Sequence, residues 1–138
     1  MNSKDYSREN LNRKKLIPKT LNHKEFGNLG ESLAEAYLID NGFKVLTRNY
    51  RTKIGEIDLI VIKESLLVFV EVKTRKSQRY GKGFEAVNVK KQQTLRRVAE
   101  QYLAYEKFSG GELSMRFDVV DVLAGKEEPV INHIENAF

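Results

Sequence analysis

The sequence predicts a single mixed α/β domain, and three observations support that prediction. The chain has 138 residues, a length that suits one domain and leaves little room for a second. Five short stretches rich in Val, Ile, Leu and Phe indicate strands, and two longer stretches with helical apolar spacing indicate helices. Their order along the chain is helix, three strands, helix, two strands. We therefore expect a mixed sheet of four or five strands flanked by helices.

Each helix is predicted from the spacing of its apolar residues. The first spans residues 27–42, and Gly42 is a natural C-terminal stop. Its spaced positions are Leu29, Leu33, Ala36, Tyr37 and Asp40. The second helix spans residues 88–107, and its apolar stripe consists of Leu95, Val98, Ala99, Tyr102 and Leu103. The pattern favours core positions over base-stacking roles for Tyr102 and for Phe117 of a later strand.

The strands are predicted at residues 43–50, 56–62, 66–73, 115–123 and 130–134. The second and third, EIDLIVI and LLVFVEVK, are apolar on both faces, which is typical of central strands covered on both sides. The turn at residues 63–65 predicts that these two form an antiparallel hairpin. The fifth strand is short and follows Pro129, which favours a sheet edge.

Charge is distributed unevenly along the chain. The net charge is +5, and residues 1–25 contribute most of it, so we expect a basic, flexible arm ahead of a domain at 26–138. A short helix around Leu11 to Ile17 and a solvated tail without a role are both compatible with that arm. From Lys73 to Arg97 nine basic side chains accompany one acidic side chain, whereas residues 98–138 are acidic. A basic flank of this kind favours a polyanionic partner such as nucleic acid.

The composition excludes several classes of protein. The absence of cysteine excludes a disulfide scaffold, a thiol nucleophile and a zinc ribbon. No apolar run approaches the ~18 residues of a membrane span. The start of the sequence has no apolar stretch that would act as a secretory signal. We expect a cytoplasmic protein that has no membrane partner.

Three charged side chains, Asp58, Glu71 and Lys73, interrupt the apolar second and third strands. Glu71 and Lys73 share a face because residues two apart in a strand point the same way, and the hairpin brings Asp58 toward them. Two carboxylates near an apolar core need a cation, a shared proton or a hydrogen-bond network. Carboxylate oxygens suit Mg²⁺ or Mn²⁺, and Lys73 is placed to orient or deprotonate a water. Glu31 of the first helix is a candidate third carboxylate.

Two other interpretations of these charges remain open. A structural ion pair would have Lys73 neutralise Glu71 while Asp58 faces solvent, because structural networks also gather carboxylates. An acid pair of the glycosidase type is less favoured, since the chain has no Trp to form a sugar platform.

Four blocks of the sequence stand out in this order: GNLGE at 27–31, RNYR at 48–51, GEIDLI at 55–60 and FVEVKTR at 69–75. Together they resemble the YraN-like predicted endonucleases of the PD-(D/E)XK nuclease superfamily, which are similar in core to archaeal Holliday-junction resolvases. The likeness takes in Gly81 and Lys91-Gln92 and extends over roughly residues 26–125. It implies a restriction-endonuclease-like core. Ile57 stands where the superfamily has a proline before its Asp.

The resemblance implies roles for individual residues. The metal ligands would be Glu31, Asp58, Glu71 and the backbone carbonyl of Val72. Lys73 would position the attacking water, and Lys91 and Gln92 would support the site or contact the scissile phosphate.

Other charged residues lie close to these blocks in the sequence. Glu56 shares a strand face with Asp58 and is a candidate supporting partner or substrate contact. Arg48, Arg51 and Arg75 are candidate phosphate-binding residues. A solvated strand-end acid is an equally good interpretation of Glu56, and an exposed surface position is the more favoured interpretation of each arginine. His23 and His133 are left unassigned, because neither has metal-ligand spacing to another candidate.

The favoured function is a Mg²⁺- or Mn²⁺-dependent endonuclease that hydrolyses phosphodiester bonds in DNA, possibly branched or otherwise non-B in structure. Metal and Lys73 would stabilise charge on the phosphoryl oxygens, and the basic segment would bind the backbone. Homodimerisation follows by analogy with junction resolvases. One alternative is a catalytically silent nucleic-acid-binding module in recombination, repair or RNA handling. Another is a protein-interaction domain that uses the acidic C-terminal flank.

Overall fold

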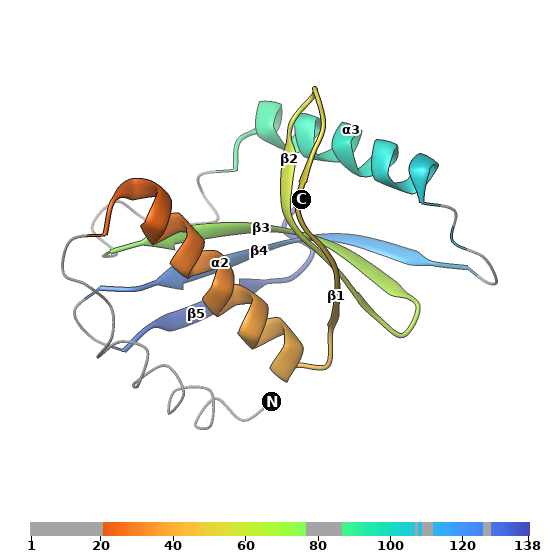
Figure 1. The fold of residues 1–138 in the computed structure, drawn as a ribbon. Coiled ribbons are helices and arrows are strands. Elements are labelled where there is room, and N and C mark those ends of the chain that lie inside the picture. Colours follow the sequence, from red (N-terminus) through yellow and green to blue (C-terminus); the bar gives the residue numbers. More distant parts are fainter. Residues whose placement is uncertain (1–20, 77–86, 107, 109–111, 126–127) are drawn as a thin grey trace.

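Two helices enclose a five-stranded mixed sheet in the computed structural model, which describes residues 21–76, 87–106, 108, 112–125 and 128–138 (Figure 1). The elements are α2 (His23–Asp40), β1 (Lys44–Arg51), β2 (Glu56–Lys63), β3 (Leu66–Arg75), α3 (Val89–Tyr105), β4 (Ser114–Leu123) and β5 (Val130–Ile134). This α/β architecture is the predicted one and is consistent with a restriction-endonuclease-like core.

The strands lie in the order in which they occur in the chain, β1-β2-β3-β4-β5. The pairs β1–β2, β2–β3 and β4–β5 are antiparallel, whereas β3 and β4 are parallel. The parallel pair requires a crossover, which α3 provides. The predicted hairpin of β2 and β3 and the edge position of β5 are both confirmed.

Each face of the sheet is covered by one helix. On one face, α2 packs through Leu33, Ala34 and Leu38 against strand residues that include Leu59, Val61, Val68, Val70, Val120 and Val122. On the other face, α3 packs through Leu95, Val98, Ala99 and Tyr102 against Ile57, Ile60, Leu67, Phe69 and Val119. Phe117 packs against this second core, so the predicted core positions of Tyr102 and Phe117 are confirmed. Burial on both faces explains why β2 and β3 have almost continuous apolar sequences.

Helix α2 begins four residues before the predicted start. Asn22 and Glu25 form a capping box, in which each side chain accepts a hydrogen bond from the backbone N–H of the other. The last residues of the predicted arm 1–25 therefore belong to the helix. The rest of that arm, with its possible short helix, lies outside the described residues, as does the basic loop beyond Lys76.

The buried stripe of α2 is also shifted from the predicted one. It consists of Gly30, Leu33, Ala34 and Leu38, while Asp40 is exposed. Gly30 is required by close packing on β3, because a Cβ atom there would lie 1.8 Å from Thr74 Oγ1. This close approach brings the start of α2 onto the carboxyl end of β3.

The sheet divides at the end where β3 finishes. The pairing of β2 with β3 ends at Leu59↔Val70. Beyond this point β2 stays paired with β1, and β3 stays paired with β4 as far as Arg75. The β1–β2 hairpin bends toward α3 (Figure 1), where a Cβ atom on Gly55 would lie 2.7 Å from Thr94 Cγ2. The strands thus separate at the charged residues of the motif.

Among the described residues, no helix combines the length and the apolar character needed to cross a membrane.

Candidate functional site

Asp58 lies where β2 and β3 separate. Its Oδ2 accepts a hydrogen bond from the backbone N–H of Val72 at 2.8 Å. Ile57 and Leu59, which flank Asp58, pack into opposite cores although they are two residues apart. Side chains two apart in a regular strand share a face, so β2 twists at Asp58. The Asp58 carboxylate thereby accepts the hydrogen bond from Val72 of β3 that a backbone carbonyl of β2 would otherwise accept.

Glu71 is buried beside two lysines, with 5% of its surface exposed. Its Oε2 lies 3.3 Å from Nζ of Lys91 on α3 and 4.0 Å from Nζ of Lys73 on β3. The predicted shared face of Glu71 and Lys73 fits this contact. Within the described part of the chain, Oε2 has no hydrogen-bond partner, because neither ammonium group has the required geometry. The negative charge on this buried Glu71 oxygen is therefore balanced by the positive charges of the two lysines and not by a hydrogen bond.

The Asp58 and Glu71 carboxyl groups lie against each other. Burial raises the pKa of Asp58 to about 9, and both a hydrogen bond with Glu71 and the negative charge of Glu71 contribute. The N–H of Val72 acts in the opposite direction. The raised pKa favours the protonated form of Asp58 at neutral pH, because a charged Asp58 would lie buried beside another carboxyl group.

A second pair of carboxylates, Glu31 and Glu56, borders the first. With its amide nitrogen facing them, Asn49 donates to Glu31 Oε1 at 2.9 Å and to Glu56 Oε1 at 3.1 Å. Burial raises the pKa of Glu31, and the charges of Glu56 and Glu71 add to this while Asn49 opposes it. The charge of Glu31 also acts on Asp58. These four acids therefore form one electrostatic unit.

Sequence reasoning overlooked Asn49, although it lies in the RNYR block. Its backbone has φ 50°, a left-handed conformation, near the end of β1. An asparagine inside a stretch of strand-forming residues was the available signal, because Asn tolerates that conformation better than other non-glycine residues.

The donor set suits a hard divalent cation at the Asp58–Glu71 pair. Mg²⁺ is commonly held by one or two carboxylates together with waters, and Glu71 Oε2 is a buried oxygen without a hydrogen bond. Within the described residues, however, no three side chains of His, Cys, Asp or Glu are grouped closely enough to hold a metal ion. The residues therefore fit a two-carboxylate site, and Glu31 as a third ligand stays a prediction.

The backbone of Val72 faces this pair. The N–H and C=O of one strand residue point to the same neighbouring strand. Since the N–H of Val72 donates to Asp58, its carbonyl points toward the same side of β3. That direction suits the predicted ligand role of Val72.

All three predicted phosphate-binding arginines pair with acids, and two of them, Arg48 and Arg51, belong to β1. Arg48 donates to both carboxylate oxygens of Glu35, with a distance of 2.7 Å from Nε to Oε1, although most of the Arg48 side chain is exposed. Arg51 Nη2 lies 3.3 Å from Glu56 Oε2 and is also largely exposed. Both guanidinium groups lie on the β1 side of the site, and their role toward phosphate stays a prediction.

Arg75 and Gln92 each donate hydrogen bonds to other parts of the protein. Arg75 donates two hydrogen bonds to the buried Asp121, from Nε at 3.0 Å and from Nη2 at 2.7 Å. Gln92 Nε2 donates to the carbonyl of Val87 at 3.1 Å, next to the start of α3. Arg75 thus pairs with a buried acid, and Lys91 lies against Glu71, while the phosphate-binding or supporting roles of Arg75 and Gln92 stay predictions.

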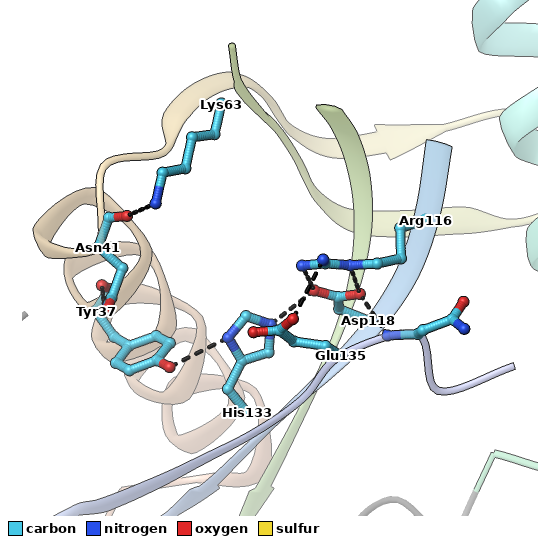
Figure 2. A network of polar contacts seen from close by, with 8 residues as sticks. Tyr37, Asn41, Lys63, Arg116, Asp118, His133 and Glu135 are labelled. Atoms are coloured by element: carbon cyan, nitrogen blue, oxygen red, sulfur yellow. Dashed lines mark hydrogen bonds and ion pairs between the residues drawn. The ribbon is translucent and has the colours of Figure 1, made fainter. Parts of the chain in front are cut away.

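A separate polar cluster joins α2 to β4 and β5. Figure 2 shows Tyr37 pointing from α2 toward His133, whose ring lies next to Asp118. His133 Nε2 is 2.7 Å from Asp118 Oδ2, and His133 Nδ1 is 3.1 Å from the Tyr37 hydroxyl. A carboxylate only accepts, so Nε2 carries a proton; in the neutral ring, Nδ1 then accepts from Tyr37.

Asp118 is fully buried at the centre of this cluster. Arg116 donates to both of its oxygens at 2.8 Å and also pairs with Glu135 at 3.2 Å. Burial raises the pKa of Asp118, but the hydrogen bonds from His133, Arg116 and the N–H of Asn136 outweigh it and hold the pKa below its ordinary value. His133 was left unassigned from the sequence because it lacks metal-ligand spacing, and its actual partners, Tyr37 and Asp118, are distant from it in the chain.

The comparisons with known proteins agree with the motif blocks. Residues 30–122 match the model of the uncharacterised protein family UPF0102. A UPF0102 protein from Alkaliphilus oremlandii is 48% identical over 116 residues, covering 84% of this chain and 99% of its own length. Two others, from Caldanaerobacter subterraneus subsp. tengcongensis (42% over 123 residues) and Bifidobacterium longum (40% over 121 residues), cover 87% of this chain and 99% and 98% of their own lengths. The resemblance predicted from the sequence is thereby confirmed: the chain belongs to the UPF0102 (YraN) family.

Proposed function

We propose that this protein is a Mg²⁺- or Mn²⁺-dependent endonuclease that hydrolyses phosphodiester bonds in DNA, with branched or non-B structures as the favoured substrates. The observation that carries the proposal is the contact between the Asp58 and Glu71 carboxyl groups at the point where β2 and β3 separate. A buried acid with a raised pKa, here Asp58, beside a second carboxyl group and flanking cationic side chains is typical of a site that exchanges protons or binds a cation.

The residues of the chain have distinct tasks in this proposal. Asp58 and Glu71 would hold the cation, with the carbonyl of Val72 beside them. When bound, Mg²⁺ or Mn²⁺ would supply positive charge to the phosphoryl oxygens in the transition state. Lys73, with 29% of its side chain exposed, would orient the attacking water through a hydrogen bond. Lys91 is more exposed, at 44%, and is free to turn toward a phosphate.

Binding would rest on charge rather than on base contacts. The basic residues that follow Glu71 in the sequence are suited to the phosphate backbone, where affinity comes from release of counterions. The order of the motif blocks and the restriction-endonuclease-like core support a nuclease. A homodimer in the cytoplasm would suit a two-fold symmetric DNA junction.

The experiment uses supercoiled, four-way branched and single-stranded DNA with Mg²⁺ or Mn²⁺. We expect cleavage by the wild type, and rates lower by about 100-fold or more for Asp58→Asn and Lys73→Ala. Asn keeps an oxygen that accepts from the Val72 N–H, so loss of activity would not reflect loss of that bond. Lys63→Ala is the matched control, because it removes a lysine at the other end of β2. Equal cleavage by all variants would contradict the assignment.

A second candidate is a nucleic-acid-binding module that keeps the fold without cleaving. The pairing of Lys91 with Glu71 favours it, because an ammonium group already lies against the carboxylate that would hold a cation. Salt-dependent DNA binding by the wild type, with no nicking in either metal, would select this candidate.

A further inference from the structure

We propose that Asn49 is a positioning residue that holds the Glu31 carboxylate of α2 against Glu56 of β2, at the border of the Asp58–Glu71 pair. This inference rests on the proposed function, because it concerns how a third carboxylate becomes available to a divalent cation. Three observations support it: the backbone conformation of Asn49, its place in the sheet and its contacts.

The backbone of Asn49 is held in an unfavourable conformation. Its φ of 50° lies in the left-handed region, which costs a non-glycine residue about 1 kcal/mol or more and is rare inside a strand. The paired residues Arg48↔Leu59 and Tyr50↔Ile57 flank it, so Asn49 stands opposite Asp58. The strain therefore occurs at the point in β1 that borders the carboxylate pair.

The contacts of Asn49 match the chemistry of one amide group. An NH₂ group has two N–H donors, and two carboxylate oxygens lie within reach, at 2.9 Å on Glu31 and 3.1 Å on Glu56. Two carboxylates side by side repel each other, and a bridging donor offsets that repulsion. Glu56 also pairs with Arg51 through its other oxygen. Among the described residues, the Asn49 side chain thus links Glu31 to the β1–β2 hairpin.

The link has a consequence for the cation site. Gly30 fixes the backbone of α2 on β3, but the Glu31 side chain that follows it has several rotatable bonds. Asn49 selects the rotamer in which Glu31 faces Glu56 and acts electrostatically on Asp58. Without Asn49, Glu31 would turn toward solvent, and the site would retain two carboxylates.

The first test compares Asn49→Gly with Asn136→Gly. Asn136 has φ 51°, so both substitutions relieve the same backbone strain. Asn136→Gly also retains the backbone N–H that donates to Asp118. With Mn²⁺ titrated into the full chain by calorimetry, we expect N49G to lower the affinity at least about tenfold. N136G should stay within about twofold of the wild type. Equal affinities for N49G and the wild type would overturn the proposal.

The second test asks whether Asn49 acts through Glu31. In an E31Q background, adding N49G should change the Mn²⁺ affinity by less than about twofold, because the positioned carboxylate is already absent. A full tenfold loss in that background would mean that Asn49 acts by a different route, and the proposal would be wrong.

The third test needs no cation. In ¹H–¹⁵N spectra of the ion-free protein, E31Q and E56Q should each shift the side-chain amide protons of Asn49, whereas Asp40→Asn should not. Unmoved Asn49 signals would overturn the positioning role. If the wild type binds no Mn²⁺ while these shifts occur, the proposed metal-dependent function is wrong but the contacts of Asn49 are supported. Failure of the proposed function can therefore be told apart from failure of the Asn49 contacts.

Discussion

Asp58 links protonation to stability, because it is buried beside a like-charged neighbour. Its pKa is raised to about 9 in the folded protein, against about 4 in an unfolded chain. The folded state therefore binds the proton more tightly. The stabilisation from this group is complete below pH 4 and is lost as the pH rises toward 9.

We expect the free energy of unfolding of the chelator-treated protein to fall between pH 5 and pH 8, and Asp58→Asn to reduce that slope. Urea unfolding at each pH provides the measurement. Asp40→Asn, which removes an exposed carboxylate, controls for the loss of one negative charge. A slope in Asp58→Asn equal to that of the wild type would show that another group is responsible.

At the residue scale, those parts of the site that follow from strand geometry could be predicted from the sequence. Asp58, Glu71 and Lys73 could be brought together because a short turn and a period of two determine which side chains meet. Asn49 and His133 could not be assigned in this way. The role of Asn49 depends on a left-handed residue within a strand, and that of His133 on partners in α2 and β4.

Two glycines of α2 give a direct test of how this element is held on the sheet. A Cβ atom at Gly30 would lie 1.8 Å from Thr74 Oγ1, whereas at Gly27 nothing lies within 4 Å. We expect Gly30→Ala to destabilise the fold by about 1–3 kcal/mol, because overpacking moves the helix away from β3.

Gly27→Ala is the matched control and should stabilise the fold by about 0.5–1 kcal/mol, since alanine is the better helix former. Thermal or urea unfolding of both variants measures the difference. If both substitutions changed the free energy of unfolding in the same direction, the close packing of Gly30 on β3 would not control the position of α2.

At the element scale, the boundaries were less predictable than the elements themselves. Both helices and all five strands lie where the apolar patterns indicate. The earlier start of α2 comes from Asn22 and Glu25, because the capping box compensates for a polar first turn that has no apolar periodicity. The strand β3 runs on to Arg75, since its parallel pairing with β4 supports residues beyond the apolar run.

At the scale of the whole molecule, the site depends on the division of the sheet. The hairpin β1–β2 carries Asn49, Glu56 and Asp58, while β3 carries Glu71 and Lys73. The two helices contribute Glu31 and Lys91, one from each face. Strand geometry predicted the meeting of Asp58, Glu71 and Lys73, whereas Lys91 was predicted only through the resemblance to a nuclease family, because periodicity alone does not show where strands separate.

The parallel pairing of β3 with β4 also has a consequence for the order of folding. The strands β1, β2 and β3 are joined by short turns, so they close at a small cost in chain entropy. Leu66 and Ser114 must meet across the whole of α3, which makes their pairing slower. In pulsed hydrogen exchange during refolding, we expect the amides of Val61 and Val68 to gain protection before that of Val120. The Asp58–Glu71 pair would then assemble in a nascent meander, before Asp118 and Asp121 find their partners.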